Sequence, residues 1–417
     1  IKAAINNMSA GITGMLCDGA KMGCSIKVSC AASAAIDASN LALNHVEIPS
    51  DNGILSSKPE LTMQNIATVS VKGMDNTDNV ILQLMLNHGK AALTGDAFPL
   101  KEDRDLDSIS SFREFFDWYK SELLHFGGLA MDCINLLDES VMYYYPTPYL
   151  SVLMESCYEK GLDVTGGGTV YNNSGVNLCG MANVVDSLNA IRQVVFQEKK
   201  VSLSQLADAL RADFRGYEEL QQELSNHAPK FGNDQDDADD CMNEMVAAFA
   251  EMVEGYRNPR GGKFQLGLYS VEDHAKMGLR TGATPDGRNA KVSLANALSP
   301  VQGKDTVGPT AVVNSVLKTD LRVATNGMVL DLKFSPSFLE SPRHMDALRD
   351  LINTYCRSGG MEIQFNVVDR ATLVDAQQHP EKHQDLVVRV SGFSAYFTTL
   401  MKTTQDEIIA RTEYANM

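Results

Sequence analysis

The 417-residue sequence predicts an α/β fold, in which helices and strands alternate and pack in layers around a hydrophobic core. Amphipathic segments with helical spacing recur along the chain, and three short runs rich in β-branched residues follow in its last third. Hydrophobic residues make up 44% of the chain and charged residues 21%, which is the composition of a globular protein with a sizeable core.

The predicted helices are spread along the chain from residue 110 onward. Apolar and aromatic residues fall on one face of residues 110–126, which predicts an amphipathic helix. Further helices are expected over residues 182–198, 203–213, 236–255 and 343–356. Thr404 and Glu407 stand three residues apart before Ile408, the spacing of a capping box, so they predict the start of the last helix.

Strands and turns complete the expected α/β pattern. Segments rich in β-branched and aromatic residues predict strands at residues 328–334, 361–368 and 386–391. Residues 166–168 (Gly-Gly-Gly) lack the Lys-Ser/Thr ending of a phosphate-binding loop, and residues 285–288 read Pro-Asp-Gly-Arg, so turns are expected at both. The acidic run 234–240 lacks the spacing of a calcium loop, which favours the solvated start of a helix.

Net charge and cysteine content limit the kinds of function that the protein can have. The formal net charge of −17 argues against nucleic acid or an anionic membrane as a partner, and no apolar run approaches the length of a membrane span. No secretory signal is recognisable, so the eight cysteines are expected to be free or metal-bound thiols in a reducing cytoplasm. The chain opens on Ile1 rather than Met, which predicts a fragment or a processed chain. Small buried hydrophobic side chains are expected at Cys133, Cys157, Cys241 and Cys356.

The most specific motif lies near the C-terminus, where residues 389–397 read Arg-Val-Ser-Gly-Phe-Ser-Ala-Tyr-Phe. It resembles the signature of the glycyl radical enzymes, in which one glycine stores a radical on its α-carbon. Glycine suits that role because it has no Cβ, so its α-carbon can flatten between the amide nitrogen and the carbonyl. An ordinary strand that ends in a glycine turn is the competing interpretation of this motif alone.

The resemblance to this family extends over residues 87–417, because further segments follow in the family's order and intervals. These segments are residues 160–168 (Lys-Gly-Leu-Asp-Val-Thr-Gly-Gly-Gly), 228–234 (Ala-Pro-Lys-Phe-Gly-Asn-Asp), 281–288 (Thr-Gly-Ala-Thr-Pro-Asp-Gly-Arg), 294–303 (Leu-Ala-Asn-Ala-Leu-Ser-Pro-Val-Gln-Gly) and 359–366 (Gly-Gly-Met-Glu-Ile-Gln-Phe-Asn).

The resemblance implies an α/β fold that forms the C-terminal half of a ten-stranded barrel of glycyl radical type, with the glycine-radical region at residues 285–417. Gly392 would carry the radical, and Arg389, Phe393 and Ala395 would shape its loop. Family members pass the radical to a cysteine on a second loop, whose thiyl attacks a small-molecule substrate. The family further implies an oxygen-sensitive lyase, dehydratase or formate acetyltransferase-like activity, a separate radical-SAM activating enzyme, and a homodimer when the enzyme is intact.

The family's cysteine loop is not found where it is expected. Residues 86–89 (Leu-Asn-His-Gly) match the pattern that ends the helix after that loop, which would put the cysteine near residues 50–65. That stretch contains no cysteine, so we expect an incomplete enzyme whose substrate cannot be assigned from the sequence. Half a barrel leaves open strand edges and apolar faces, which predicts self-association.

Residues 1–86 resemble a different family, the C-terminal end of the L-cysteine desulfidase and L-serine dehydratase alpha-type proteins, and are expected to be mainly helical. Residues 17–27 (Cys-Asp-Gly-Ala-Lys-Met-Gly-Cys-Ser-Ile-Lys) carry this resemblance. It implies that Cys17 and Cys24 ligate an oxygen-sensitive [4Fe–4S] cluster, with further ligands supplied from upstream. Two incidental thiols are the competing interpretation.

The chain is therefore expected to be a chimera of two anaerobic lyase segments that join near residues 79–89, with domains at 1–86 and 87–417. The joint is either a genuine fusion or a product of sequence assembly. Three functions stay open: the radical-bearing part of a glycyl radical enzyme, a non-catalytic chimeric remnant, and an iron–sulfur L-serine or L-cysteine lyase function of residues 1–86.

Overall fold

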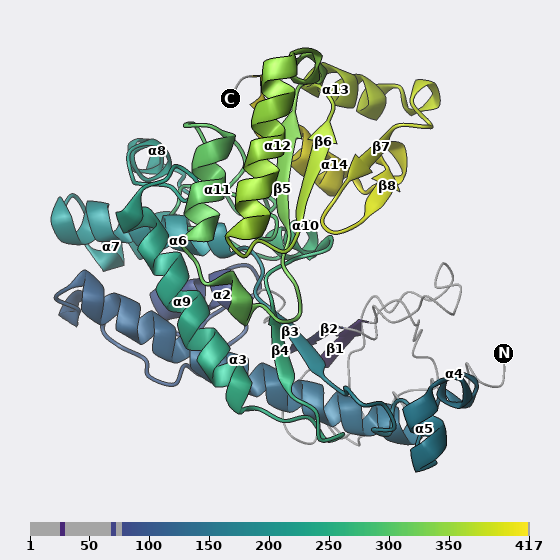
Figure 1. Cartoon of the computed structure of the whole chain (residues 1–417). Coiled ribbons are helices and arrows are strands. Elements are labelled where there is room, and N and C mark those ends of the chain that lie inside the picture. The colour runs from purple at the N-terminus through teal and green to yellow at the C-terminus, as the bar shows by residue number, and fades with distance from the viewer. Residues whose placement is uncertain (1–25, 30–67, 72–76, 416–417) are drawn as a thin grey trace. The chain divides into compact units, whose positions relative to one another are not determined.

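The computed structural model describes residues 26–29, 68–71 and 77–415 (Figure 1). Two compact units divide the chain. The smaller unit includes Phe126–Gly175, Met252–Gln265 and the first two described strands, and the larger unit comprises Asn76–His125, Val176–Glu251 and Leu266–Met417. The predicted cluster ligands Cys17 and Cys24, and most of the segment predicted to be helical before residue 77, lie outside the described residues.

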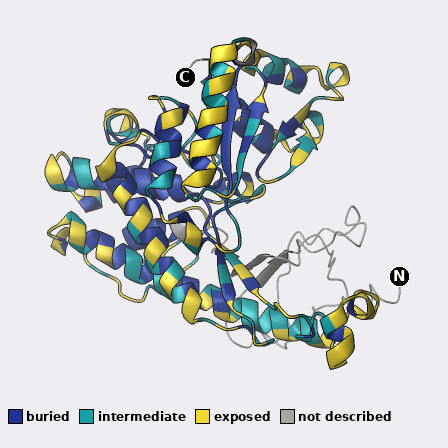
Figure 2. Ribbon diagram, in the orientation of Figure 1, coloured by how far each residue is buried: buried dark blue, intermediate teal, exposed yellow. Residues whose placement is uncertain are grey.

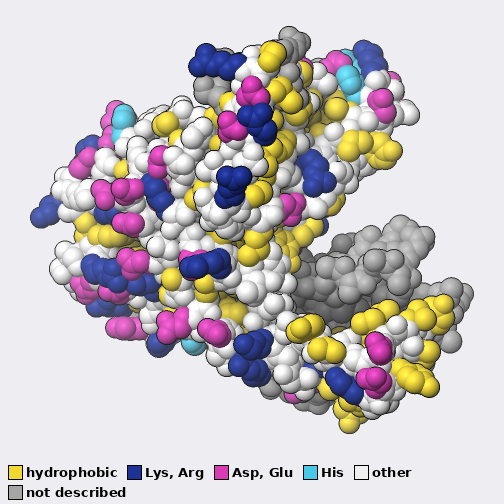
Figure 3. Space-filling view, viewed as in Figure 1, with side chains coloured by type: hydrophobic (Ala, Val, Ile, Leu, Met, Phe, Trp, Pro, Cys, Tyr) yellow, Lys and Arg dark blue, Asp and Glu magenta, His cyan; other side chains and the backbone are white. Residues whose placement is uncertain are grey.

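In the smaller unit a pair of antiparallel strands and several helices are described. Its elements are β1 (Ile26–Ser29), β2 (Thr68–Val71), the second part of α3 (Phe112–Tyr144), α4 (Pro148–Leu153) and α5 (Glu155–Lys160). α4 and α5 expose large apolar side chains, among them Tyr149, Val152, Leu153 and Tyr158, and hydrophobic atoms crowd this part of the surface in Figure 3.

A turn follows α5. The amides of Gly166 and Gly168 both donate to the carbonyl of Asp163, at 3.0 and 2.9 Å. The Asp163 side chain accepts hydrogen bonds from Ser151 and from the Thr165 amide, which close the same turn. The structural turn predicted for the three glycines is confirmed.

Helices form most of the larger unit. They are α2 (Thr77–Leu86), the first part of α3, α6 (Met181–Ala190) with its π-helical continuation Ile191–Gln197, α7 (Leu203–Arg211), α8 (Glu218–Asn226), α9 (Asp236–Gly255), α10 (Asp273–Gly278), α11 (Pro309–Leu317), α12 (Pro342–Arg357), α13 (Arg370–Gln378) and α14 (Lys402–Ala410). The five helices predicted between residues 110 and 356 are present, although α3 continues beyond residue 126 to Tyr144. No described helix is both long enough and apolar enough to cross a membrane.

A three-stranded parallel sheet organises the C-terminal region. β5 (Leu330–Phe334) lies between β6 (Ile363–Val367) and β9 (Glu413–Tyr414), and Asp331 pairs with Gln364 across the first two strands. All five residues of β5 are buried, as expected for the central strand of a parallel sheet. α12 connects β5 to β6 and keeps an exposed face along its length, as Figure 2 shows.

Two further strand pairs are short. β3 (Ser174–Asn177) pairs with β4 (Phe264–Gly267), and β7 (Val387–Arg389) pairs antiparallel with β8 (Ser394–Tyr396). The three predicted strands therefore correspond to β5, β6 and β7. β5 starts later than expected and ends as predicted, whereas β6 and β7 are shorter at both ends. Beneath the β7–β8 hairpin lies an apolar cluster that includes Val388, Phe397 and Ile408.

Two local predictions were wrong, both because tertiary contacts override local sequence. The capping box of Thr404 and Glu407 does not form: α14 begins at Lys402, and the Glu407 carboxylate pairs with a buried arginine instead of capping the helix. Cys356 is exposed rather than buried, because it faces outward from α12. Cys157 and Cys241 are buried as predicted, and Cys133 is half-buried.

The acidic run opens α9 as predicted, but one of its carboxylates turns inward. Asp239 is buried and lies 2.9 Å from the ammonium group of Lys318, which Asp234 and Asp236 also contact. Burial raises the pKa of Asp239, against the opposing effect of Lys318. Within the described part of the chain, no group of three or more His, Cys, Asp or Glu side chains is arranged to hold a metal ion.

Candidate functional site

Gly392 lies in the tight loop that joins β7 to β8. The strands pair from Val387 opposite Tyr396 to Arg389 opposite Ser394, and the Val390 amide donates to the Phe393 carbonyl at 2.9 Å. Gly392 is exposed and has a φ of +82°, in the left-handed region that favours glycine. A Cβ on Gly392 would meet Val329 only at 3.7 Å, so backbone conformation rather than crowding requires glycine there.

Below the loop, Gln364 on β6 accepts a hydrogen bond from the amide of Gly392. Its Oε1 atom lies 3.3 Å from the Gly392 nitrogen and 3.0 Å from the Nε atom of Arg389. Its Nε2 atom donates to the carboxylate of Asp331 on the neighbouring strand. Because the guanidinium of Arg389 only donates, its contact with Oε1 fixes which end of the Gln364 amide faces Gly392.

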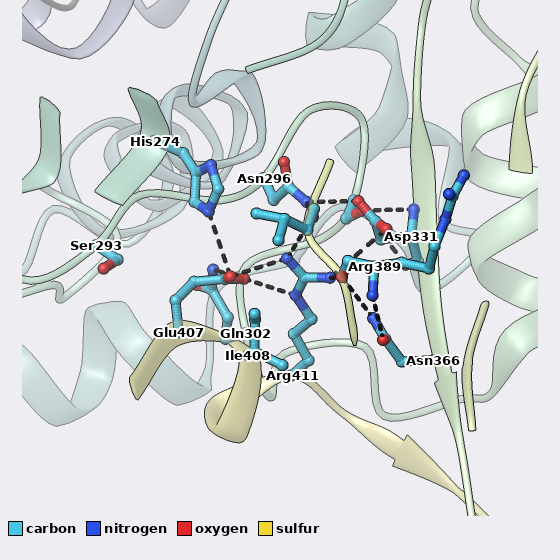
Figure 4. A network of polar contacts seen from close by, with 12 residues as sticks. His274, Ser293, Asn296, Gln302, Asp331, Asn366, Arg389, Glu407, Ile408 and Arg411 are labelled. Carbon is cyan, nitrogen blue, oxygen red and sulfur yellow. Dashed lines mark hydrogen bonds and ion pairs between the residues drawn. The ribbon is translucent and has the colours of Figure 1, made fainter. Parts of the chain in front are cut away.

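The two carbonyls that precede the loop are held by buried side chains. Asn366 accepts from the Arg389 amide and donates to its carbonyl, both at 2.8 Å. Asn296 donates to the Val390 carbonyl at 2.9 Å, and a guanidinium nitrogen of Arg411 donates to the same oxygen at 2.8 Å (Figure 4). The backbone that leads into the loop is thus fixed at both of its last carbonyl groups.

Arg411, which follows α14, is the centre of a buried charge network. It forms a two-pronged ion pair with Glu407, with both contacts at 2.9 Å, and lies 3.5 Å from Asp331. Burial lowers the pKa of Arg411, but Glu407 and Asp331 outweigh this effect and raise it. Arg411 therefore stays charged although it is buried.

Two further side chains contact the Glu407 carboxylate. The Nε2 atom of His274 lies 3.2 Å from one carboxylate oxygen of Glu407, and Gln302 donates to the other at 3.0 Å (Figure 4). Burial raises the pKa of Glu407, but the charge of Arg411, together with the neighbouring His274, outweighs this effect and holds the pKa well below its usual range. His274 is linked in turn through Ser270 to Asn296, so the network closes on the loop.

At Asp331, burial has the largest effect on the pKa of the carboxyl group. Burial raises its pKa to about 7, although Arg411 opposes the shift. Its two oxygens accept from Gln364 and from Asn296, the latter at 2.5 Å. Asp331 therefore connects the residue under Gly392 with the residue that holds the Val390 carbonyl.

The structure brings together the four residues predicted at this site. Gly392, Arg389, Phe393 and Ala395 all belong to the β7–β8 hairpin, and Phe393 and Ala395 pack on the apolar cluster beneath it. The side chain of Arg389 reaches Gln364 and the Ser394 hydroxyl rather than the solvent alone. Their roles in shaping a radical loop stay a prediction.

Sequence reasoning missed the residues that hold the loop. These are His274, Asn296, Gln302, Asp331, Gln364, Asn366, Glu407 and Arg411. A signal was present in β6, where Gln364 and Asn366 alternate with apolar residues, and both prove to be buried. Buried side-chain amides need hydrogen-bond partners. Polar residues on the buried face of a strand therefore indicate that another backbone segment contacts that face.

Sequence models of three families match the chain. The model described as pyruvate formate lyase-like matches residues 67–278, and the model described as glycine radical matches residues 294–398. The model described as serine dehydratase alpha chain matches residues 1–83, so it overlaps the first match.

Curated relatives match 80% of the chain. Trans-4-hydroxy-L-proline dehydratase of Clostridioides difficile is 35% identical over 333 residues, which cover 42% of the relative. (2S)-3-sulfopropanediol dehydratase of Klebsiella oxytoca is 34% identical over 338 residues, which cover 41% of it. The chain thus spans less than half the length of the curated relatives it matches.

Solved structures are similar over the same region. The glycerol-bound B12-independent glycerol dehydratase from Clostridium butyricum superposes with a TM-score of 0.77 at 39% identity, over 82% of this chain and 44% of that one. Hydroxyproline dehydratase from Clostridioides difficile with trans-4-hydroxy-L-proline bound gives a TM-score of 0.77 at 35% identity, over 81% of this chain and 42% of that one.

Proposed function

The chain belongs to the pyruvate formate lyase-like family of glycyl radical enzymes, and from this premise we propose that it is the radical-bearing C-terminal part of an anaerobic dehydratase or lyase. The α/β fold of glycyl radical type expected from the sequence is confirmed by the solved relatives. We assign the radical to Gly392, on the strength of its place in the β7–β8 loop at a φ of +82° within the glycine radical match.

Radical formation at Gly392 is the loss of one hydrogen atom from its α-carbon. The hydrogen passes to the radical of an activating enzyme of the radical-SAM class, and the unpaired electron stays on the glycine. There it is shared between the amide nitrogen, which donates, and the carbonyl, which withdraws. Gly392 is exposed among the described residues, and this exposure would give such a partner access to it.

The relatives narrow the proposed reaction. Those named above are dehydratases of hydroxyproline, sulfopropanediol and glycerol, all small hydroxylated molecules. We propose that the intact enzyme removes water from a substrate of this class, in a reducing and anoxic cytoplasm. We assign no cysteine to the thiyl step, since the segment 50–65 contains none.

The test of this proposal is electron paramagnetic resonance (EPR) of the protein after anaerobic activation. The activating enzymes of hydroxyproline dehydratase and of glycerol dehydratase, with S-adenosylmethionine and a reductant, should produce a doublet from the α-hydrogen that remains on Gly392. Exposure to oxygen should then yield a fragment that ends at Ser391. Absence of the doublet with both activating enzymes would contradict the assignment.

The matched control is a second glycine with a similar conformation. Gly303 has a φ of +75° and open space around its α-carbon, so Gly303→Ala carries a similar backbone strain away from the loop. Gly392→Ala should abolish the doublet, and Gly303→Ala should retain it. Radical formation without turnover of any small hydroxylated substrate would favour the non-catalytic remnant.

The serine dehydratase alpha chain match at residues 1–83 supports a second proposed function. We propose that Cys17 and Cys24 are iron–sulfur ligands, to be completed by ligands from elsewhere. Anaerobic incubation with iron and sulfide should give the visible absorbance of a cluster. Cys17→Ser and Cys24→Ser should remove the absorbance and Cys30→Ser should not; equal loss in all three variants, or no absorbance at all, would contradict the assignment.

A further inference from the structure

Gln364 is the side chain that touches the backbone of Gly392. Among the hydrogen bonds of the described residues, its Oε1 atom is the acceptor for the Gly392 amide, at 3.3 Å. The other loop contacts hold neighbouring residues: Asn366 binds Arg389, and Asn296 and Arg411 bind the Val390 carbonyl. Among the described residues, the hydrogen bond from the Gly392 amide therefore goes to Gln364.

The orientation of Gln364 is built into the sheet. Gln364 is paired with Asp331 in the parallel register of β6 and β5, and both are buried. Asp331 accepts from Nε2, and the Nε atom of Arg389 donates to Oε1 at 3.0 Å. A flipped Gln364 would turn its Nε2 towards two donors, the amide of Gly392 and the guanidinium of Arg389, so only one orientation is stable.

This orientation matters for a radical centred on the adjacent α-carbon. An N–H group that donates a hydrogen bond keeps its peptide plane fixed, and its nitrogen becomes a better electron donor. Both effects favour an unpaired electron shared between the nitrogen and the carbonyl of a planar glycine. The distance of 3.3 Å is long for an N–H to oxygen hydrogen bond.

We propose that Gln364, oriented by Asp331, is a positioning residue that fixes the amide of Gly392 and tunes the stability of its radical. The proposal rests on the assignment of the radical to Gly392 but makes a separate statement about the same loop. It predicts an effect on the radical itself, not only on the fold.

The experiment compares Gln364→Met with a matched control, Gln83→Met. Gln83 is also a buried glutamine whose Oε1 accepts from a glycine amide at 3.3 Å, that of Gly282, and whose Nε2 donates to the Ala283 carbonyl. Both variants remove one hydrogen bond accepted from a glycine amide and one donated by Nε2, and only Gln364→Met does so at Gly392. Gln364→Met also removes the hydrogen bond that Oε1 accepts from Arg389.

EPR of protein labelled with ¹⁵N-glycine is the primary measurement. Gln364→Met should change the nitrogen hyperfine coupling and shorten the anaerobic lifetime of the doublet roughly five-fold, the effect of losing one hydrogen bond worth ~1 kcal/mol. Gln83→Met should leave both at the wild-type values. An unchanged coupling and lifetime in Gln364→Met, with a normal wild-type doublet, would overturn the inference while the radical assignment stands.

A rescue variant separates this role from general stability. Asp331→Asn combined with Gln364→Glu exchanges the two groups, so that the amide introduced on β5 can donate and the carboxylate introduced on β6 can accept from Gly392 and Arg389. The double variant should recover the coupling that Gln364→Met loses. Failure to recover it in a protein with a wild-type unfolding midpoint would count against the inference.

A readout without the radical keeps the two proposals distinguishable. In unactivated protein, Gln364→Met should speed hydrogen exchange of the Gly392 amide roughly five-fold, and Gln83→Met should not. If the wild-type shows no doublet but the exchange rate rises as expected, the radical assignment fails and Gln364 still positions the loop. An unchanged exchange rate would overturn the inference independently of any radical.

Discussion

The carboxyl group of Asp331 has a pKa close to neutral pH, so it is partly protonated there. Its folded pKa of about 7 lies well above the unfolded value of about 3.9, because burial disfavours the charge more than Arg411 favours it. Between these two values the folded state retains a proton that the unfolded state releases. Folding stability contributed by Asp331 is therefore present below about pH 4 and is lost as the pH rises towards about 7.

The prediction for Asp331→Asn is a flatter pH profile of stability. Wild-type unfolding free energy should fall between about pH 4 and about pH 7 with a slope of at most ~1.4 kcal/mol per pH unit from this residue. Asp186, whose burial also raises its pKa to about 7, contributes in the same direction, so the variant should keep part of the slope. Urea titrations at several pH values measure the slope of the unfolding free energy against pH. An unchanged slope in Asp331→Asn would contradict the raised pKa of Asp331.

At the scale of elements, α14 and the β7–β8 hairpin are joined by Arg411. Arg411 follows the last turn of α14 and donates to the carbonyl of Val390, which follows β7 and leads to Gly392. Glu407 lies one helical turn earlier and neutralises it. The ion pair between Arg411 and Glu407 explains why Glu407 does not take part in the predicted capping box.

Arg411→Met should destabilise the larger unit strongly, because it leaves the Glu407 carboxylate buried beside His274 without its main counter-charge. A loss of ~3–5 kcal/mol is expected for one broken partner of a buried pair. The double variant Arg411→Met with Glu407→Gln should recover most of that loss, since no isolated charge remains. Urea unfolding followed by the fluorescence of Trp118, the single tryptophan, measures both; equal instability of the two variants would argue against the pair.

The same elements show what the sequence could and could not predict. The strand and turn of the β7–β8 hairpin were predictable because their signal is local: a β-branched run followed by a glycine. The role of its glycine was predicted only from the family resemblance. α9 was predicted with its observed bounds, since its apolar spacing is regular and its start is acidic. The network behind the loop was not predictable, because His274, Asn296, Asp331 and Arg411 meet only when separate elements pack. Gln364 was visible as a polar residue in a strand, but its partner was not.

At the scale of the whole molecule, α2 lies at the border of two resemblances. The serine dehydratase alpha chain match ends at residue 83, and the pyruvate formate lyase-like match begins at residue 67. In the structure, Asn79 donates to the Gly180 carbonyl at 2.9 Å and Gln83 donates to the Ala283 carbonyl at 2.9 Å, so α2 satisfies buried backbone groups of the larger unit. The domain boundary between residues 86 and 87 stays a prediction, and the contacts of α2 favour a border before Thr77.

This choice of border can be tested through Asn79. If α2 is an integral part of the larger unit, Asn79→Leu removes the side-chain hydrogen bond to the Gly180 carbonyl, which keeps the Asn183 amide as a donor, and should cost ~1 kcal/mol of unfolding free energy. Trp118 is buried in the same unit, so its fluorescence reports the transition directly. Asn314→Leu is the control, because Asn314 donates to Asp234 at an exposed position of that unit, and its midpoint should hardly move. A wild-type midpoint for Asn79→Leu would instead assign α2 to the preceding segment and support the border after residue 86.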